Sequence, residues 1–216
     1  MKRFIKKNIY LLPIFFISFA FITIGSKNSP LYLINDWYDA QAFMTMGKGL
    51  INGLIPYKDL FEQKGPILYF IYALANLIST KTFFGVYLIE IFSFTAFLAY
   101  VRKTIKLFFS DKYVYSSIML LTFAILMLKP FGHGGAAEEL CLPFFMYSIY
   151  SMFKYLKIGS ITKREIFVNG LMAGIILWTK YTLLGFHFIL AATYFFVEFF
   201  NKKYKSALNM YIILHY

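Results

Sequence analysis

The sequence has 216 residues, of which 60% are hydrophobic and 15% are charged, and its mean hydropathy is +0.63. A soluble domain of this length could not bury so much apolar surface inside one core, so the composition excludes that class. The formal net charge is +12. The Lys and Arg residues stand at the ends of apolar blocks and do not form a basic face with interleaved aromatics, which favours a membrane protein over a nucleic-acid-binding one.

The apolar blocks predict the fold class, an all-α polytopic helical membrane protein. Lipid tolerates only helices or closed barrels, and barrel strands would alternate apolar and polar residues, which these blocks do not. The single cysteine, Cys141, excludes an internal disulfide bond. We expect helices in the blocks 9–25, 66–80, 83–101, 113–129, 140–156, 166–178 and 183–200.

The amino-terminal block predicts a retained signal anchor. It is long for the apolar region of a cleaved signal peptide, and "GSKNSP" after it is a poor cleavage site. By the positive-inside rule, the basic residues before the block place the amino terminus of this multi-pass protein on the cytoplasmic side of the cell membrane. These residues are Lys2, Arg3, Lys6 and Lys7.

The next two apolar blocks disagree with the number of membrane crossings that the charges require. The segment 26–65 is then outside and the basic cluster 102–112 is inside, so the chain must cross an odd number of times between them. Block 66–80 would span only about 22 Å as a helix, against a hydrocarbon core of about 30 Å. We therefore expect this block to lie in the interface or to re-enter, while 83–101 crosses. The alternative is that the cluster 102–112 lies outside despite its charge.

A last apolar run begins at Ala207 and stops at Tyr216, short of the about 20 residues that a spanning helix needs. We therefore expect residues 1–216 to form a single transmembrane module that is the amino-terminal portion of a longer protein.

Two segments carry most of the acidic residues. The first outer loop, 26–65, and the second outer loop, 130–139, together hold six of the ten, and the expected topology places both loops on one side of the membrane. Carboxylates that converge there can act as a general base, as metal ligands or as binding groups for a polar substrate. The six are Asp36, Asp39, Asp59, Glu62, Glu138 and Glu139.

The acidic residues of the first outer loop also have simpler, structural explanations. Asp36 is a candidate N-cap for an amphipathic helix over about 37–52, and Asp39 would then favour the dipole of its first turn. Gly53 can end this helix. The charged residues of "YKDLFEQK" can also be ion-paired with one another as a solvated run.

The stretch "DAQAFMTMGKGLINGLIPYKDLFEQKGPILYF", from Asp39 to Phe70, resembles the first outer loop of GT-C glycosyltransferases. The closest group is the bacterial branch related to protein mannosyltransferases and lipid A aminoarabinose transferases. Its members show an acidic residue, a helix ending in Gly, a "PY-basic-D" turn and "KGP" or "KPP" before an apolar helix. The later segment "HGGAAEELCLPF" resembles a Gly-Gly-x-x-Glu-Glu-x-x-x-Pro-Phe segment of the same branch.

The resemblance implies roles for individual residues. Asp39 is the expected base on the acceptor, although Ala40 stands where the family has a second acidic residue, so Asp36 is the candidate substitute. Glu138 or Glu139 is expected to orient the acceptor or a divalent cation. The donor in this family is usually a sugar on a polyprenyl phosphate.

Inverting transfer also needs positive charge near the departing phosphate. Lys64, Lys180 and His133 are the candidates at the outer surface. Each has a simpler alternative: the lysines as interfacial side chains whose stems lie along apolar surface, and His133 as a loop residue bonded to backbone. His187, inside an apolar block, is expected to be a helix-contact residue.

The expected function is thus transfer of a sugar from a polyprenyl-phosphate donor to an envelope acceptor, a teichoic acid or another polysaccharide. The alternative is a non-catalytic membrane protein, either a degenerate GT-C fragment or a flippase or transporter component. A transporter should carry charged residues deep inside its helices, and Glu90 and Glu198 are the main candidates.

Overall fold

The computed structural model describes residues 9–200, so the amino-terminal basic residues and the run after Ala207 lie outside the described residues. Within this part all named secondary-structure elements are helices, and no β-strand forms. The elements are α2 (Leu11–Gly25), α3 (Tyr38–Ile51), α4 (Pro66–Ile78), α5 (Phe84–Phe108), η1 (Asp111–Tyr113), α6 (Val114–Leu126), α7 (Lys129–His133), α8 (Ala137–Ile158), α9 (Lys163–Leu177), η2 (Tyr181–Leu184) and α10 (Gly185–Phe200).

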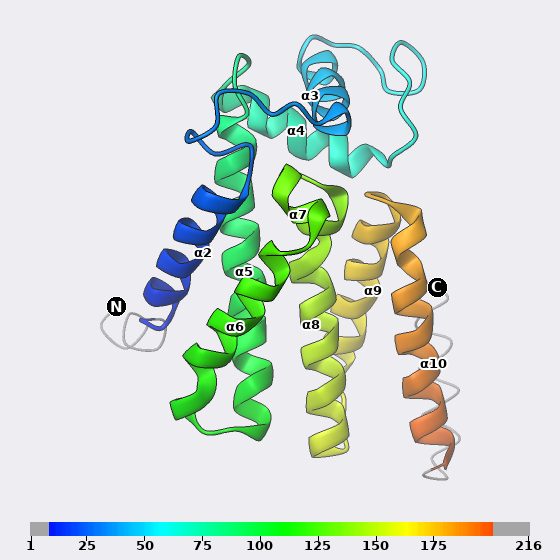
Figure 1. The fold of residues 1–216 in the computed structure, drawn as a ribbon. Helices are drawn as coiled ribbons and strands as arrows, with labels where there is room; N and C mark the ends of the chain where they lie inside the picture. Colours follow the sequence, from blue (N-terminus) through cyan, green and yellow to red (C-terminus); the bar gives the residue numbers. More distant parts are fainter. Residues whose placement is uncertain (1–8, 201–216) are drawn as a thin grey trace.

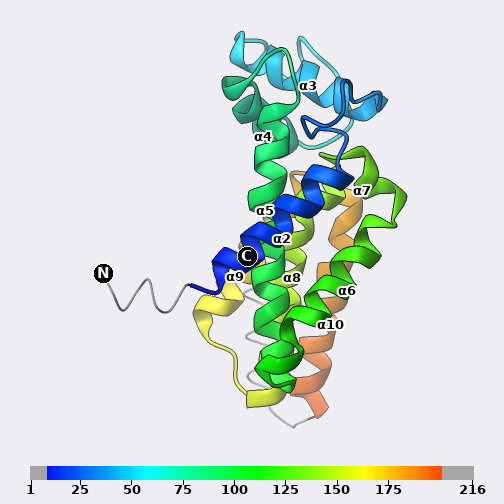
Figure 2. The ribbon, with the colours of Figure 1, turned by 60° about the vertical axis from the view of Figure 1, so that its left-hand side comes forward.

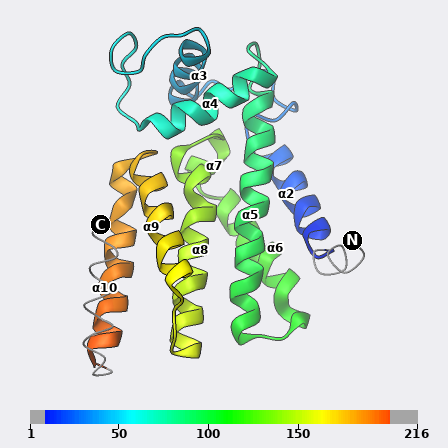
Figure 3. The ribbon, with the colours of Figure 1, turned by 180° about the vertical axis from the view of Figure 1, so that it is seen from behind.

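The helices form a lengthwise bundle with a layer across one end. Figure 1 shows α5, α8, α9 and α10 running along the bundle, with α2 and α6 inclined beside α5. Helices α3 and α4 lie crosswise above them, as Figures 2 and 3 show from two other sides. We call α3, α4 and the loops 26–37 and 52–65 the cap, and the bundle end beneath them the cap end.

Among residues 9–200, two stretches are long and apolar enough to cross a membrane, α5 and the continuous run Tyr181–Phe200, while α2 and α4 are apolar but shorter. The predicted all-helical fold is confirmed, and the number of crossings stays a prediction. Block 66–80 forms α4, which lies across the bundle end, the orientation expected of a helix that does not cross with the others.

Helix α3 is the expected helix over 37–52, and Gly53 follows it with a positive φ of 82°. Its buried side carries Phe43 and Met44, which pack with Leu68 and Tyr72 of α4. Because α4 covers this face, the apolar side of α3 is not free to lie in lipid. The same cluster includes Val86, Ala137 and Leu140, which fastens the cap to α5 and α8.

The far end of the bundle is basic. Helix α5 continues seven residues beyond the predicted end at 101, since Arg and Lys are good helix formers and are favoured near a helix C-terminus. Arg102 and Lys106 pair with Asp111 at 3.9 and 2.8 Å. Lys157 of α8 donates to the backbone oxygen of Leu107, so the basic ends of α5 and α8 meet.

The segment predicted as the second outer loop, 130–139, contains parts of two helices, and its place outside the membrane stays a prediction. Helix α7 occupies its first part and α8 begins at Ala137, so Glu138 and Glu139 lie in the first turn of a helix. Carboxylates are favoured there by the helix dipole. Only a short bend remains, in which Gly134 and Gly135 have φ of 76° and 72°.

A buried polar network fastens this bend to the bundle. Glu90 of α5 is fully buried and accepts hydrogen bonds from the Ser26 hydroxyl (2.9 Å), the Asn28 amide (3.3 Å) and the backbone N–H of Gly135. Glu139, also buried, accepts from the same N–H at 3.0 Å. A buried carboxyl group is costly without such partners, so the network fixes both loops over the end of α5.

Gly135 is therefore a position where both conformation and space require glycine. A Cβ added there would lie 2.3 Å from the Tyr72 hydroxyl, whereas a Cβ at Gly159, whose φ is similar at 75°, would meet nothing within 4 Å. We predict that Gly135→Ala lowers the free energy of unfolding by about 1–3 kcal/mol more than Gly159→Ala does. Chemical unfolding of the purified variants in detergent measures this. Equal losses would show that the close approach to Tyr72 is unimportant.

Candidate functional site

A cavity of about 310 Å³ lies where the cap meets the bundle. Its walls come from the start of α3, the loop before α4, the α7–α8 bend and the corner between α9 and η2. Five of the seven predicted site residues line it, and Asp36 and Glu139 do not. The lining residues are Trp37, Asp39, Phe43, Lys64, His133, Ala136, Ala137, Glu138 and Lys180.

Backbone pairing brings the two lysines of the cavity together. The N–H of Gly65 donates to Thr179 O at 2.9 Å, and the N–H of Ile67 donates to Trp178 O at 3.1 Å. A Cβ at position 65 would lie 1.9 Å from Trp178 O, so a residue larger than glycine does not fit there. The glycine of "KGP" thus allows Lys64 to lie beside the corner that carries Lys180.

Asp39 stands in the first turn of α3, and its side chain is half-buried on the cavity wall. It makes no hydrogen bond or ion pair with any residue in the described range 9–200. Asp39 is therefore free to accept a proton or a hydrogen bond from a molecule in the cavity.

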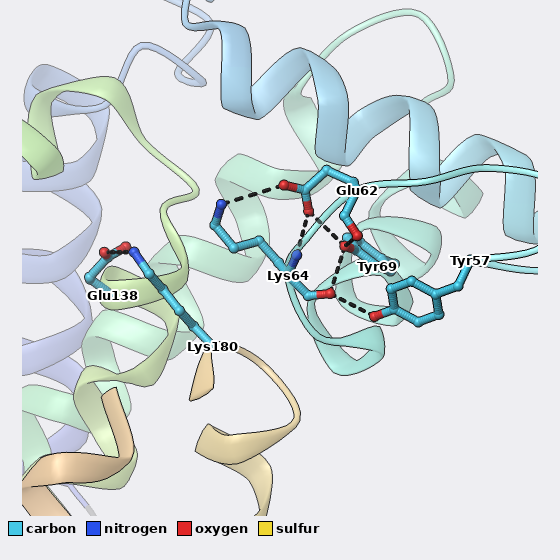
Figure 4. Close-up of polar contacts among 6 residues, drawn as sticks. All are labelled: Tyr57, Glu62, Lys64, Tyr69, Glu138 and Lys180. Atoms are coloured by element: carbon cyan, nitrogen blue, oxygen red, sulfur yellow. Dashed lines mark hydrogen bonds and ion pairs between the residues drawn. The ribbon is translucent and has the colours of Figure 1, made fainter. Parts of the chain in front are cut away.

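Lys64 is held by its own loop, as Figure 4 shows. Its ammonium lies 3.4 Å from Glu62 Oε1 and 5.7 Å from the centre of the Phe43 ring. Its backbone oxygen accepts a hydrogen bond from the Tyr57 hydroxyl at 2.6 Å and lies 2.7 Å from the Tyr69 hydroxyl, which is also 2.6 Å from Glu62 Oε2. The anchored backbone directs a lysine side chain that would otherwise be free to move.

The turn before Lys64 is strained. Tyr57 has a φ of 66°, the one positive φ outside glycine in the described residues, and its N–H donates to Leu60 O at 2.6 Å. Such a conformation costs on the order of 1–3 kcal/mol and persists only where the surroundings impose it. Here the hydrogen bond from the Tyr57 hydroxyl to Lys64 offsets part of that cost. In the sequence, only the Pro56–Tyr57 pair indicates a turn at this place.

Lys180 forms an ion pair with Glu138 at the cavity wall. The two side chains are 25% and 39% exposed, so water and small solutes reach the pair. The pair joins the first turn of α8 to the corner after α9. An incoming anion can compete with Glu138 for this ammonium.

His133 is stacked on Trp37, with ring centres 5.3 Å apart and an angle of 15° between the rings. Its backbone oxygen accepts a hydrogen bond from Asn35 at 2.8 Å, while its Nδ1 is buried without a partner among the described residues. The pair forms an aromatic wall of the cavity. Trp37 was not recognised in the sequence, where it reads as one more interfacial aromatic.

Two of the predicted site residues lie elsewhere. Asp36 is not the N-cap of α3, since Trp37 takes that position and no side chain caps the helix. Instead Asp36 is exposed and pairs with Lys27 at 2.5 Å, and the pKa of its carboxyl is lowered by the hydrogen bond and charge of that lysine. Glu139 faces the interior beside Glu90, about 100° around α8 from Glu138. Between the two adjacent glutamates, Glu138 is the one at the cavity.

The expected charge run from Lys58 to Lys64 is only partly ion-paired. Lys64 and Glu62 form a pair, whereas Asp59 accepts a hydrogen bond from the backbone N–H of Ile55 at 2.8 Å and so closes the turn. As for metal ligands, residues 9–200 contain no group of three or more His, Cys, Asp or Glu side chains placed to hold an ion.

Comparisons with known proteins add no relative: no family model, no curated protein and no solved structure matches this chain.

Glu62 gives the site a dependence on pH. Burial alone would raise the pKa of this carboxyl, but hydrogen bonds from the Tyr69 hydroxyl (2.6 Å) and the Lys64 N–H (2.8 Å), with the Lys64 ammonium, outweigh it and lower the pKa. A lowered pKa stabilises the fold above the unfolded-state value, and this stabilisation is lost as the pH falls through the folded-state value.

We therefore predict that Glu62→Gln is less stable than the wild type at neutral pH, by about 1–2 kcal/mol. The difference should be constant above about pH 5 and shrink below about pH 4.3. Urea unfolding of both proteins over this pH range measures it. A difference that does not change with pH would contradict the role assigned to the ionised Glu62.

Proposed function

We propose that the chain is an integral-membrane glycosyltransferase of the GT-C kind, with several crossings of the cell membrane and a cytoplasmic amino terminus. The cap end faces outward. There the protein moves a sugar from a polyprenyl-phosphate donor to an envelope acceptor, a teichoic acid or another polysaccharide. The basic cluster at the end opposite the cap, which includes Arg102, Lys106 and Lys157, supports this orientation. The cap end also carries lysines, three of which are paired with acidic residues: Lys27, Lys64 and Lys180.

One observation carries the proposal: the half-buried carboxylate of Asp39 has no partner in the described part of the chain, yet it shares a cavity with Lys64 and Lys180. A carboxylate that served only the fold would be expected to have a capping or ion-pair partner, as Asp36 has with Lys27. A base and two cations in one cavity suit the transfer of a sugar from a leaving group that departs as an anion.

The proposed reaction proceeds by inversion. Asp39 takes the proton of the acceptor hydroxyl as its oxygen forms a bond to the anomeric carbon of the sugar. The bond from that carbon to the phosphate oxygen breaks, and the polyprenyl phosphate leaves with the electron pair. Lys64 and Lys180 stabilise the negative charge on the phosphate, with Lys180 exchanging its contact to Glu138 for one to the phosphate.

The residues at the cavity favour ammonium groups over a divalent cation for this task. Asp39 and Glu138 are the carboxylates that line it, and Glu138 is already paired with Lys180. The aromatic wall of Trp37 and His133 offers a flat apolar surface to a sugar ring.

A flippase or transporter component is the alternative, and the burial of Glu90 and Glu139 inside the bundle favours it. Their hydrogen bonds to Gly135 and to Ser26 account for both residues as a fastening of the loops. We therefore keep the enzyme as the proposal.

The test is sugar transfer from labelled polyprenyl-phosphate sugars in membranes that contain the chain. We predict that Asp39→Asn lowers the transfer rate on the order of a hundredfold or more, since the base is removed with little change in volume. The matched control is Asp36→Asn, three residues away and outside the cavity, which should transfer at close to the wild-type rate. Equal rates for wild type and Asp39→Asn would remove Asp39 from the chemistry, and no transfer by any of the three proteins would favour the non-catalytic alternative.

A further inference from the structure

A groove of about 460 Å³ runs along α5, α8 and α9, apart from the cap-end cavity. Figure 3 shows these helices running lengthwise, and α8 packs against both of the others. The α5 side of the groove is formed by residues that recur at helical spacing and share one face: Ile89, Phe92, Ser93, Ala96 and Tyr100. From Ile89 to Tyr100 the helix rises about 16 Å, close to the hydrocarbon depth of one leaflet, about 15 Å.

The groove ends in tyrosines on the side away from the cap. Tyr100 of α5 and Tyr147 of α8 line it, with ring centres 5.3 Å apart, and Tyr150 lies against Tyr100 at 6.1 Å. Each of the three hydroxyl groups is accessible, and none forms a hydrogen bond with a residue in the range 9–200. Tyrosines are favoured at the membrane interface, where their hydroxyl groups can donate to a lipid headgroup. Apart from Ser93, the rest of the lining is apolar.

Lys103 brings an ammonium group to this end of the groove. It follows Tyr100 by three positions on the same face of α5, and its Nζ lies 4.3 Å from the centre of the Tyr100 ring. The side chain is partly buried and forms no ion pair within the described part of the chain, whereas Lys106, on another face, pairs with Asp111 at 2.8 Å. A partly buried cation without a counter-charge is costly, so an anion beside Lys103 would stabilise the protein.

The other two helices carry basic residues beyond the same end of the groove. On α9, Arg164 lies one turn before the lining residue Val168, is exposed, and has no ion pair among the described residues. On α8, Lys154 lies two turns after Tyr147 and pairs with Glu165 at 2.5 Å. Glu165 therefore neutralises one of the three cations, and two remain for a ligand.

An apolar groove as long as one leaflet is deep, ending in hydroxyl groups and two unpaired cations, has the chemistry to hold a phospholipid. We propose that it binds an anionic phospholipid such as phosphatidylglycerol. One acyl chain lies along the groove, and the phosphate contacts Lys103 and Arg164 and accepts hydrogen bonds from the tyrosine hydroxyls. A zwitterionic lipid is disfavoured, since its own ammonium group would lie near these two cations. In the proposed orientation this end faces the cytoplasm, so the lipid belongs to the inner leaflet.

The polyprenyl chain of the proposed donor is a competing occupant. Its phosphate would have to reach Lys64 and Lys180 at the cap end, whereas the unpaired Lys103 lies at the opposite end of the groove. A helix of a second copy of the chain would cover the apolar part but would leave Lys103 without an anion. The lipid proposal rests on the membrane location in the proposed function but not on its chemistry.

Native mass spectrometry of the purified full chain in detergent tests the proposal, with phosphatidylglycerol and phosphatidylcholine of identical acyl chains as the probes. The wild type should bind one phosphatidylglycerol saturably, at least fivefold more tightly than phosphatidylcholine. We predict that Lys103→Gln weakens phosphatidylglycerol binding about fivefold and leaves phosphatidylcholine binding unchanged, since one basic residue near a lipid surface contributes about this factor. The matched control is Lys106→Gln, which removes a lysine paired with Asp111 and should leave both affinities unchanged.

The apolar part of the groove is tested with Ala96→Leu. This change places a larger side chain at an exposed lining position and should weaken the binding of both lipids at least tenfold. Its control is Ala191→Leu, in the separate cavity between α9 and α10, which should leave both affinities unchanged. Thermal unfolding confirms that each variant is folded.

Equal affinity of the wild type for the two lipids would overturn the proposal, as would unchanged phosphatidylglycerol binding in Lys103→Gln or in Ala96→Leu. Displacement of bound phosphatidylglycerol by an equal concentration of a polyprenyl phosphate would assign the groove to the donor instead. Loss of self-association in Ala96→Leu at unchanged lipid affinity would assign it to a second copy of the chain. Because lipid binding is measured without a sugar donor, failure here is distinct from failure of sugar transfer.

Discussion

The cap-end cavity depends on one close contact, the backbone pairing of residues 65–67 with residues 178–179. The segments are more than a hundred positions apart in the sequence, and only glycine at position 65 lets them approach so closely. The contact sets Lys64 beside the corner that carries Lys180. Packing of α3 on α4 then fixes where Asp39 stands.

The adjacent glutamates at the start of α8 show how one helix turn serves two purposes. Glu138 is at the cavity with Lys180, and Glu139 is inside the bundle with Glu90 and the Gly135 N–H. The inner carboxyl groups fasten the loops, so the outer groups can remain exposed to a ligand. The position of the cap-end site is therefore tied to polar contacts deep in the bundle, although Glu90 itself contributes nothing to the cavity wall.

Much of the helical fold and part of the candidate site could be predicted from local patterns in the sequence. Hydropathy indicated the helices, and Gly53 indicated the end of α3. The resemblance pointed to Asp39 and to Glu138 or Glu139, and an expected place at the outer surface pointed to Lys64 and Lys180. Long-range contacts could not be predicted. No pattern near Asp36 in the sequence indicates that Lys27 is its ion-pair partner. Likewise, no pattern near His133 indicates that its ring stacks on Trp37. The sequence prediction began the helix at 140, after a loop over 130–139, whereas α8 begins at Ala137. Glu138 and Glu139 were assigned to the loop, although acidic residues also favour the first turn of a helix.

The proposed function requires that the cap, with Asp39 and Lys64 at its cavity, faces the outside, while the opposite end with Arg102 and Lys106 faces the cytoplasm. Labelling of single cysteines with a membrane-impermeant maleimide tests it most directly, after the buried Cys141 is replaced by Ala. Cysteines at the exposed positions Leu33 and Phe61 report on the cap, and one at Ile158 reports on the opposite end. The account predicts labelling of the cap positions in intact cells and of position 158 only after permeabilisation. Labelling of position 158 in intact cells, with the cap protected, would contradict it.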